Sequence, residues 1–266
     1  MERESVGDVE VTALSDCLMV YSASSIYPKA GDDMQRYSAY LTEDGSVEMN
    51  CACFLLRADG ATVLMDAGLG PESDGQLMSE LEQAGVAPGD IDVVIFSHLH
   101  GDHTGWNVDR DSGQPKFPNA RYLVERRDWE QLLAQDPPAR SFDRDFQPLQ
   151  AADSIEPIDL DHRLTDSLVA TSIPGHTPGH LGVAIESGGE RGLLIGDSML
   201  SAIDIEEPDW ENSYDRDSDT ARQTRRELVE RLEADATLVG AAHLPVPSLG
   251  HVVRAEGRLV WRGLGS

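Results

Sequence analysis

Three histidines and an aspartate fall within six residues in the segment HLHGDH. His98 and His100 stand two residues apart after an apolar run, so an extended chain would point both side chains the same way. Asp102 and His103 follow within one turn, and Gly101 between the two pairs lets the backbone bend. Imidazole and carboxylate groups are the ligands that zinc and similar metals prefer. This cluster therefore predicts a metal site.

Three further ligand-type residues follow apolar runs elsewhere in the chain. His176 ends the run LVATSIPGH, Asp197 ends RGLLIGD and His243 ends TLVGAAH. In α/β sheets, functional sites gather at the carboxyl ends of strands, so we expect these side chains to meet the first cluster. Seven ligands exceed the four that one tetrahedral zinc uses. Two metals that share one carboxylate fit the count.

The elements that must position these residues are visible as short apolar, β-branched runs that alternate with segments of helical spacing. We predict strands over residues 11–20, 51–56, 61–68, 91–98, 121–125, 168–175, 180–187, 191–197 and 237–243. We predict helices over residues 74–85, 125–135 and 218–234. The alternation is typical of an α/β fold.

The three predicted helices each present an apolar stripe to the core. The stripes consist of Leu77, Leu81 and Ala84, then Trp129, Leu132 and Leu133, then Ala221, Leu228 and Leu232. Gly85 is a plausible end of the first helix, and Ser218 can cap the third. Residues 137–148 and 201–219 are long and polar, so we expect loops there, either binding elements or lids or mobile surface.

The composition limits the partners. Lys and Arg total 21 against 48 Asp and Glu, which gives a formal net charge of −27. Such an excess repels phosphate backbones and anionic headgroups, so we expect no nucleic acid and no membrane partner. A biased genome composition or adaptation to high salt would each explain the acidity. With 266 residues, of which 40% are hydrophobic, we expect a single domain over residues 1–266.

The location and the cysteines follow from simpler features. The N-terminal sequence has no apolar signal segment, and no run of about 18 apolar residues could span a bilayer. We therefore expect a cytoplasmic protein. Cys17, Cys51 and Cys53 are odd in number and form no CxxC pair. We expect buried packing thiols rather than disulfides or metal ligands.

The motifs HLHGDH, PGHTPGH, GDS and AAHLP resemble, in order and spacing, the motif series of the metallo-β-lactamase superfamily. MDAGLG at residues 65–70 is similar to the family's early strand-turn motif, so the resemblance covers roughly residues 50–250. It implies an αββα four-layer sandwich, in which two mixed sheets pack face to face with helices outside. It also implies two Zn²⁺ per chain, with iron and manganese as the alternatives. The ligands would be His98, His100 and His176 for one metal, Asp102, His103 and His243 for the other, and Asp197 as the bridge.

The ligand types distinguish the branches of this superfamily. Asp197 stands where the secreted zinc β-lactamases have a cysteine, and His100 stands where the diiron oxygen-reducing branch has a glutamate. Both residues favour a hydrolase. One alternative is a glyoxalase II-like thioesterase, for which Arg254 and Arg258 are candidate basic residues near the C-terminus. A diiron redox protein and a non-catalytic metal-binding member of the fold are the others.

The sequence from GDSMLSAIDIEEPDW onward is similar to the subgroup that contains methyl parathion hydrolase and relatives of the N-acyl homoserine lactone lactonases. This resemblance implies hydrolysis of a small-molecule lactone, ester or phosphotriester, and its members suggest a homodimer. Leu200 is a departure, because the lactonases place a tyrosine there, near the substrate carbonyl. Tyr37 and Tyr214 are candidates to supply that group, and Trp106 and Trp210 are candidates to line the pocket.

A dinuclear zinc site predicts a mechanism. A hydroxide that bridges the metals would attack the carbonyl or phosphoryl centre, while the metals take the developing charges. Asp102, as proton carrier, and Asp197, as bridging ligand, are therefore the expected catalytic residues. We expect Asp66 to accept a hydrogen bond from a ligand histidine and His180 to support the site without binding metal. No site for an organic cofactor is expected.

Overall fold

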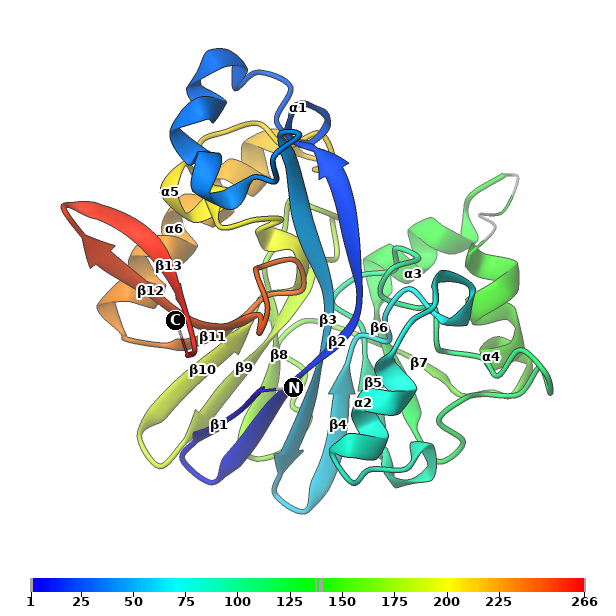
Figure 1. The fold of residues 1–266 in the computed structure, drawn as a ribbon. Helices are drawn as coiled ribbons and strands as arrows, with labels where there is room; N and C mark the ends of the chain where they lie inside the picture. The colour runs from blue at the N-terminus through cyan, green and yellow to red at the C-terminus, as the bar shows by residue number, and fades with distance from the viewer. Residues whose placement is uncertain (1, 137, 139–140, 266) are drawn as a thin grey trace.

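Two β-sheets pack face to face, with helices on their outer faces, in the computed structural model, which describes residues 2–136, 138 and 141–265 (Figure 1). The first sheet has seven strands in the order β1 to β7. Their bounds are Glu2–Val6 (β1), Val9–Ser22 (β2), Ser46–Ala58 (β3), Ala61–Met65 (β4), Val93–Ile95 (β5), Arg121–Glu125 (β6) and Ile155–Ile158 (β7).

The second sheet has six strands in the order β13-β12-β11-β10-β9-β8. Their bounds are Leu168–Ser172 (β8), Leu181–Ser187 (β9), Glu190–Leu194 (β10), Leu238–Gly240 (β11), Leu249–Ala255 (β12) and Arg258–Gly263 (β13). Both sheets are mixed, because β4 to β7 run parallel in the first and β10 pairs parallel with β11 in the second, while the other pairs are antiparallel. The predicted αββα sandwich is confirmed.

The core consists of layers that follow from the alternation of side chains along the strands. The inner layer joins the two sheets and includes Phe54 and Ile95 from the first and Val183 and Leu194 from the second. The outer face of the first sheet is covered by α2 (Leu77–Gln83), α3 (Arg126–Leu133) and α4 (Gln147–Ala151). That of the second is covered by α5 (Ile203–Glu206) and α6 (Ser218–Ala234).

A small helical layer lies over the upper ends of β2 and β3 (Figure 1). It comprises α1 (Ala23–Ile26) and the 3-10 segment Gly31–Tyr40. Ile26, Tyr27 and Tyr37 of this layer are buried against Leu200 and Ile203. The layer thereby joins the N-terminal part of the chain to the segment that follows Asp197.

Most predicted elements are present, with several corrections. Asp217 rather than Ser218 caps α6, because its carboxylate accepts from the backbone N–H of Thr220. Leu133 is 46% exposed rather than part of the core face. Residues 142–148, expected within a loop, lie in a π-helical turn (Phe142–Phe146) and the start of α4, and the loop predicted at residues 201–219 contains the short helix α5. Positions 137, 139 and 140 of the first predicted loop lie outside the described residues. Cys17 is only half-buried, whereas Cys51 and Cys53 are buried, as expected.

Several elements lack a sequence prediction. They are β1, β7, the hairpin of β12 and β13, and the helical layer at residues 23–40. The hairpin had a readable signal, because Glu256 and Gly257 form a two-residue connection in which both φ angles are positive. Among the described residues, no helix has both the length and the apolarity needed to cross a bilayer.

Candidate metal centre

The seven predicted ligands lie together at the carboxyl ends of four strands. His98, His100, Asp102 and His103 follow β5, while His176, Asp197 and His243 follow β8, β10 and β11. These strands belong to both sheets, so the site lies at the edge where the two sheets meet. The side chains form two groups, and within each group the candidate ligand atoms all lie within 4.8 Å of one another. The first group is His98, His100 and His176, and the second is Asp102, His103, Asp197 and His243.

In the first group, nitrogen atoms of three imidazole rings lie close together. His98 Nε2 lies 2.8 Å from His100 Nδ1, and His176 Nε2 lies 3.1 Å from the same atom. Two nitrogens bound to one tetrahedral zinc at about 2.0–2.1 Å lie roughly 3.3 Å apart. Burial, together with the nearby His176, lowers the pKa of His100 to about 4, so its imidazole is neutral near pH 7 and has a lone pair for a metal.

The second group combines carboxylates with histidines. Asp102 Oδ2 lies 3.5 Å from His243 Nε2 and 3.6 Å from His103 Nε2. Burial alone would raise the pKa of Asp102, but His103 and a hydrogen bond with His243 lower it to about 2. Burial would lower the pKa of His243, but Asp197 and Asp102 raise it to about 10. The two carboxylates therefore stabilise a positive charge at His243, and they would stabilise a bound metal cation in the same way once the histidine proton is released.

Asp197 faces both groups. Its Oδ2 lies 3.0 Å from His243 Nε2 and 3.6 Å from His176 Nε2, and its Oδ1 lies 3.2 Å from His103 Nε2. Asp197 Oδ1 and His103 Nε2 are buried without an aligned hydrogen-bond partner among the described residues. Buried polar atoms of this kind are costly unless a ligand or ion satisfies them. The donor set of both groups thus fits divalent metal, and Asp197 lies between the two groups.

Hydrogen bonds to the remaining ring nitrogens direct the ligand atoms inward. His103 Nδ1 lies 2.9 Å from Asp66 Oδ2, and Asp66 also accepts from the backbone N–H and the hydroxyl of Ser97 at 2.8 Å each. His243 Nδ1 donates to the backbone carbonyl of Asn50 at 2.6 Å. Each arrangement keeps a proton on Nδ1, so Nε2 is the nitrogen that would bind a metal after losing its own proton. The supporting role of Asp66 stays a prediction, which this geometry favours.

His180 lies outside both ligand groups, and both of its ring nitrogens have other partners. Nδ1 lies 2.9 Å from the carbonyl oxygen of Ile173, and Nε2 accepts from the backbone N–H of Asp197 at 3.0 Å. Burial, together with the nearby His176, lowers the pKa of His180 to about 3, so the ring is neutral. It holds the turn that carries Asp197.

Asp16 is a supporting residue that the sequence analysis missed. This buried carboxylate accepts from the backbone N–H of Leu69 at 2.8 Å and from Leu77 at 2.9 Å, and it binds the indole N–H of Trp106 at 2.7 Å. Trp106 therefore packs beside the metal loop and does not line the cavity. Gly105 lies so close to Leu69 that an added Cβ would come within 2.1 Å of the Leu69 carbonyl carbon.

A cavity of about 470 Å³ opens onto the ligands. Five of the candidate ligands line it, namely His100, Asp102, His176, Asp197 and His243. The other lining residues are Gly101, Met19, Tyr21, Met49, Leu69, Arg144, Leu200 and Tyr214. Tyr214 was a candidate for the tyrosine that Leu200 replaces, whereas Tyr21 was missed. Tyr37, the other candidate, is buried away from the cavity, where its hydroxyl binds Glu207. Trp210 packs on that ring and does not line the cavity either.

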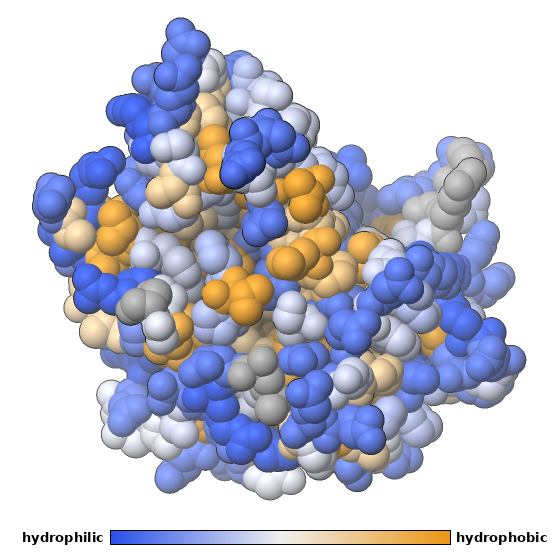
Figure 2. Space-filling model, in the orientation of Figure 1, coloured by the Kyte–Doolittle hydropathy of each residue, from blue (hydrophilic) through white to orange (hydrophobic). Residues whose placement is uncertain are grey.

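The surface around the upper part of β2 is apolar. Figure 2 shows a largely hydrophilic face with apolar groups gathered near its centre, where Figure 1 places the upper part of β2 and the loop between β11 and β12. The large apolar side chains exposed in these two segments are Leu18, Val20, Tyr21 and Val246. Tyr21 also lines the cavity, so apolar surface continues from the rim into the site.

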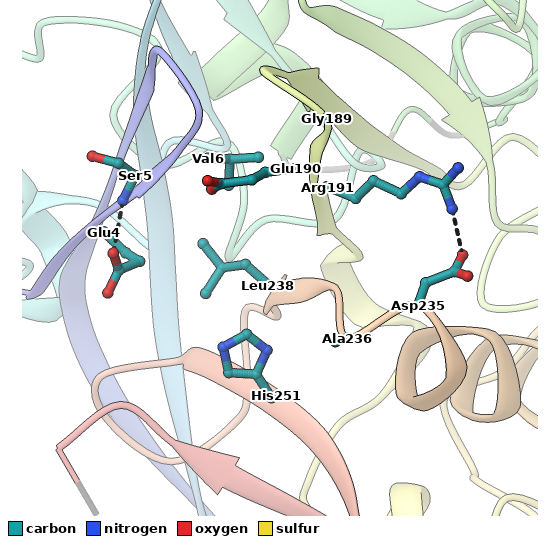
Figure 3. A pocket seen from close by; sticks show the side chains of 10 residues that line it. All are labelled: Glu4, Ser5, Val6, Gly189, Glu190, Arg191, Asp235, Ala236, Leu238 and His251. Carbon is teal, nitrogen blue, oxygen red and sulfur yellow. Dashed lines mark hydrogen bonds and ion pairs between the residues drawn. The ribbon is translucent and has the colours of Figure 1, made fainter.

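A second cavity, of about 530 Å³, lies at the other end of β10 and contains no comparable cluster (Figure 3). Its polar side chains are occupied with their neighbours, since Arg191 binds Asp235 at 2.9 Å and Glu190 accepts from the N–H of Gly7 at 3.1 Å. His251 Nδ1 lies 3.0 Å from the Thr237 carbonyl oxygen. Among the described residues, no metal-type grouping occurs there.

A known family matches this combination of a two-sheet sandwich and a cluster of histidines and aspartates at the edge of the sheets. The Metallo-beta-lactamase superfamily model matches residues 47–243, a span that contains all seven candidate ligands. The chain belongs to the metallo-beta-lactamase superfamily.

The individual proteins that match the chain are identical to it at about a quarter of the aligned positions. The chain is 26% identical over 175 residues to "N-acyl homoserine lactonase AttM" of Rhizobium radiobacter. The aligned region covers 63% of this chain and 64% of that protein, so the chain spans less than two thirds of that relative's length. It is 24% identical over 186 residues to an N-acyl homoserine lactonase of Bacillus thuringiensis, covering 61% and 69%.

Two solved structures share the fold over nearly the whole chain. AidC, described as a dizinc quorum-quenching lactonase in complex with a product, is 24% identical with a TM-score of 0.85, covering 100% of this chain and 97% of that one. The hydrolase AbOPH, described as a member of the beta lactamase superfamily, is 24% identical with a TM-score of 0.87, covering 99% and 97%. At this identity the likeness establishes the fold alone.

Proposed function

We propose that this chain is a dinuclear zinc hydrolase that opens lactone rings. The observation that carries the proposal is the position of Asp197 between the two histidine groups. Its Oδ2 lies 3.0 Å from His243 Nε2 of one group and 3.6 Å from His176 Nε2 of the other, and its Oδ1 lies 3.2 Å from His103 Nε2. A carboxylate in this position is suited to bridge two cations. The proposed ligands are His98, His100 and His176 on one side, Asp102, His103 and His243 on the other, and Asp197 between them.

A pair of divalent ions in such a site supplies Lewis-acid activation of a water molecule and of a carbonyl oxygen. The residues of the chain position the groups that react. Asp102 lines the cavity and its side chain is 20% exposed, against 4% for Asp197, so we assign it the proton of the attacking water. As the new C–O bond forms, the ring C–O bond breaks, and Asp102 returns the proton to the leaving oxygen. The product is a hydroxy acid.

The substrate class rests on two supports. The matching relatives are named N-acyl homoserine lactonases, and the cavity joins the ligands to an apolar wall that includes Met19, Met49 and Leu200. This wall suits a small molecule that carries a hydrocarbon substituent. Esters and phosphotriesters, which need the same activated water, are the other substrate classes that we include.

The test is a substrate panel on zinc-loaded protein. γ- and δ-lactones, aryl esters, thioesters and phosphotriesters are assayed, and we expect the highest kcat/KM with a lactone. His176→Ala should lose zinc and hydrolysis, whereas the matched control His162→Ala, outside both ligand groups, should keep both. Preference for a thioester would favour a glyoxalase II-like enzyme. Two irons with oxygen consumption, or zinc binding without any turnover, would overturn the proposal.

We also propose that the chain forms one domain over residues 1–266. Val6 of the first strand and Leu249 of the penultimate strand pack in the same inner core, so neither half has a complete core of its own. The homodimer that the resemblance implies remains a prediction, which light scattering tests.

A further inference from the structure

His176 differs from three neighbouring candidate ligands in the partner of its second ring nitrogen. His98, His103 and His243 each place Nδ1 within hydrogen-bonding distance of a partner. His176 Nδ1 is buried without one, and the nearest carboxylate oxygen reported for it is Asp215 Oδ1, at 3.6 Å. Asp215 Oδ1 is equally buried and has no hydrogen-bond partner among the described residues.

Arg225 determines which oxygen of Asp215 faces the histidine. Arg225 Nη1 donates to Asp215 Oδ2 at 2.8 Å, and the two side chains are 1% and 0% exposed. Arg225 also donates to the carbonyl oxygens of Pro208 and Trp210, at 3.3 and 3.0 Å. Because Oδ2 is held by this ion pair, Oδ1 is the oxygen left for His176.

Backbone contacts hold the two residues side by side. The N–H of Arg216, next to Asp215, donates to the carbonyl oxygen of His176 at 3.1 Å, and the N–H of Asp217 donates to Gly175 at 3.0 Å. Gly175 lies directly against α6, since an added Cβ would come within 2.4 Å of the Ala221 Cα. The end of β8 and the start of α6 are therefore fixed to each other.

We propose that Asp215 is a positioning residue for His176, held in place by Arg225. When metal occupies the site, Asp215 Oδ1 accepts the Nδ1 proton of His176, which fixes the tautomer that presents the Nε2 lone pair to the metal. A gap of 3.6 Å is too long for a hydrogen bond, so the two side chains close by about half an ångström. The inference rests on the proposed metal site and assigns a role to a residue outside the seven ligands.

Two substitutions separate positioning from a structural role. In Asp215→Asn, Arg225 can only donate, so the amide oxygen faces Arg225 and the NH₂ group faces His176. That donor favours a proton on His176 Nε2, the tautomer that cannot bind metal there. In Asp215→Ala neither tautomer is imposed, but the buried Arg225 loses its partner. We therefore expect Asp215→Asn to bind zinc more weakly than Asp215→Ala does, although Asp215→Ala lowers the Tm more.

Asp204→Asn is the matched control. Asp204 is also buried near Arg225, which opposes the rise that burial causes in its pKa. Its Oδ2 accepts from the N–H groups of Leu200 and Ser201, at 2.7 and 3.2 Å, and among the described residues its side chain forms no hydrogen bond or ion pair with His176. The Asp204→Asn control removes a carboxylate charge near the same residue, Arg225. We expect its zinc affinity to stay within about threefold of the wild type.

The experiment is zinc titration in competition with a chromophoric chelator, with Tm measured for every variant. Loss of a supporting hydrogen bond weakens metal binding by about 10–100-fold, and we expect this loss in Asp215→Asn. Equal affinity in the wild type and Asp215→Asn, or affinities that follow Tm across the series, would overturn the inference. Failure of the wild type to bind zinc would instead contradict the proposed function.

A measurement on the zinc-loaded wild-type chain does not depend on a variant that folds. With ¹⁵N-labelled histidine, NMR identifies which nitrogen of His176 carries the proton. We expect the proton on Nδ1, with slow exchange against solvent because Asp215 accepts it in a buried site. A proton on Nε2, or rapid exchange from Nδ1, would contradict the assignment.

Discussion

Gly175→Ala tests how closely the end of β8 must approach α6. Gly175 has a φ of +131°, which side-chain-bearing residues rarely adopt, and the new Cβ would lie 2.4 Å from the Ala221 Cα. Carbon atoms in contact lie about 3.5–4.0 Å apart, so the loop or the helix must move by more than 1 Å. Backbone strain of about 1–3 kcal/mol adds to overpacking of about 1–3 kcal/mol. The variant should be about 2–6 kcal/mol less stable than the wild type.

The matched control is Gly60→Ala, in the turn between β3 and β4. Gly60 has a φ of +82° but nothing within 4 Å of an added Cβ, so it carries the strain without the clash. Urea denaturation of both variants gives the difference, provided that their m-values agree. We expect Gly175→Ala to be less stable than Gly60→Ala by about 1–3 kcal/mol. A difference below about 0.5 kcal/mol, within the range of ordinary surface changes, would refute the close-approach reasoning.

Three further predictions address the site and the domain. Asp66→Asn should weaken zinc binding by about 10–100-fold in chelator competition, because the amide NH₂ would face His103 Nδ1 and favour the wrong tautomer; unchanged affinity would sink this reasoning. Removal of metal with a chelator should lower the Tm in calorimetry, and zinc should restore it, since a ligand at 100 times its Kd stabilises the native state by about 2.7 kcal/mol. An unchanged Tm would argue against a metal in the folded site. The metal-free chain should unfold in one cooperative transition with equal calorimetric and van't Hoff enthalpies, and two separate transitions would contradict a single domain.

The strands that carry the candidate ligands could be predicted from the sequence. The runs before His98, His176, Asp197 and His243 are apolar and β-branched, and each ends in a ligand-type residue. Both features are local, so they can be read from one chain. The family motifs then supplied the sandwich, because topology depends on pairings between distant segments that spacing does not specify.

The residues that the sequence could not identify act through contacts distant along the chain. Asp215 and Arg225 are common residue types in polar stretches, and only the folded chain shows that they are buried beside His176. Asp16 is a similar case, since its partners Leu69 and Trp106 lie more than fifty residues away. The helical residues 142–148 were missed because Pro148 and the charged residues before it are typical of loops.

The most direct test of the central claim is the hydrolysis rate of a γ-lactone measured as metal-free protein is titrated with zinc. Two groups that share Asp197 predict that the rate rises until two equivalents per chain are bound and then stays constant, and that Asp197→Ala does not reach this rate at any zinc level. Saturation at one equivalent, or near-normal turnover by Asp197→Ala with a single zinc, would contradict the shared dinuclear site.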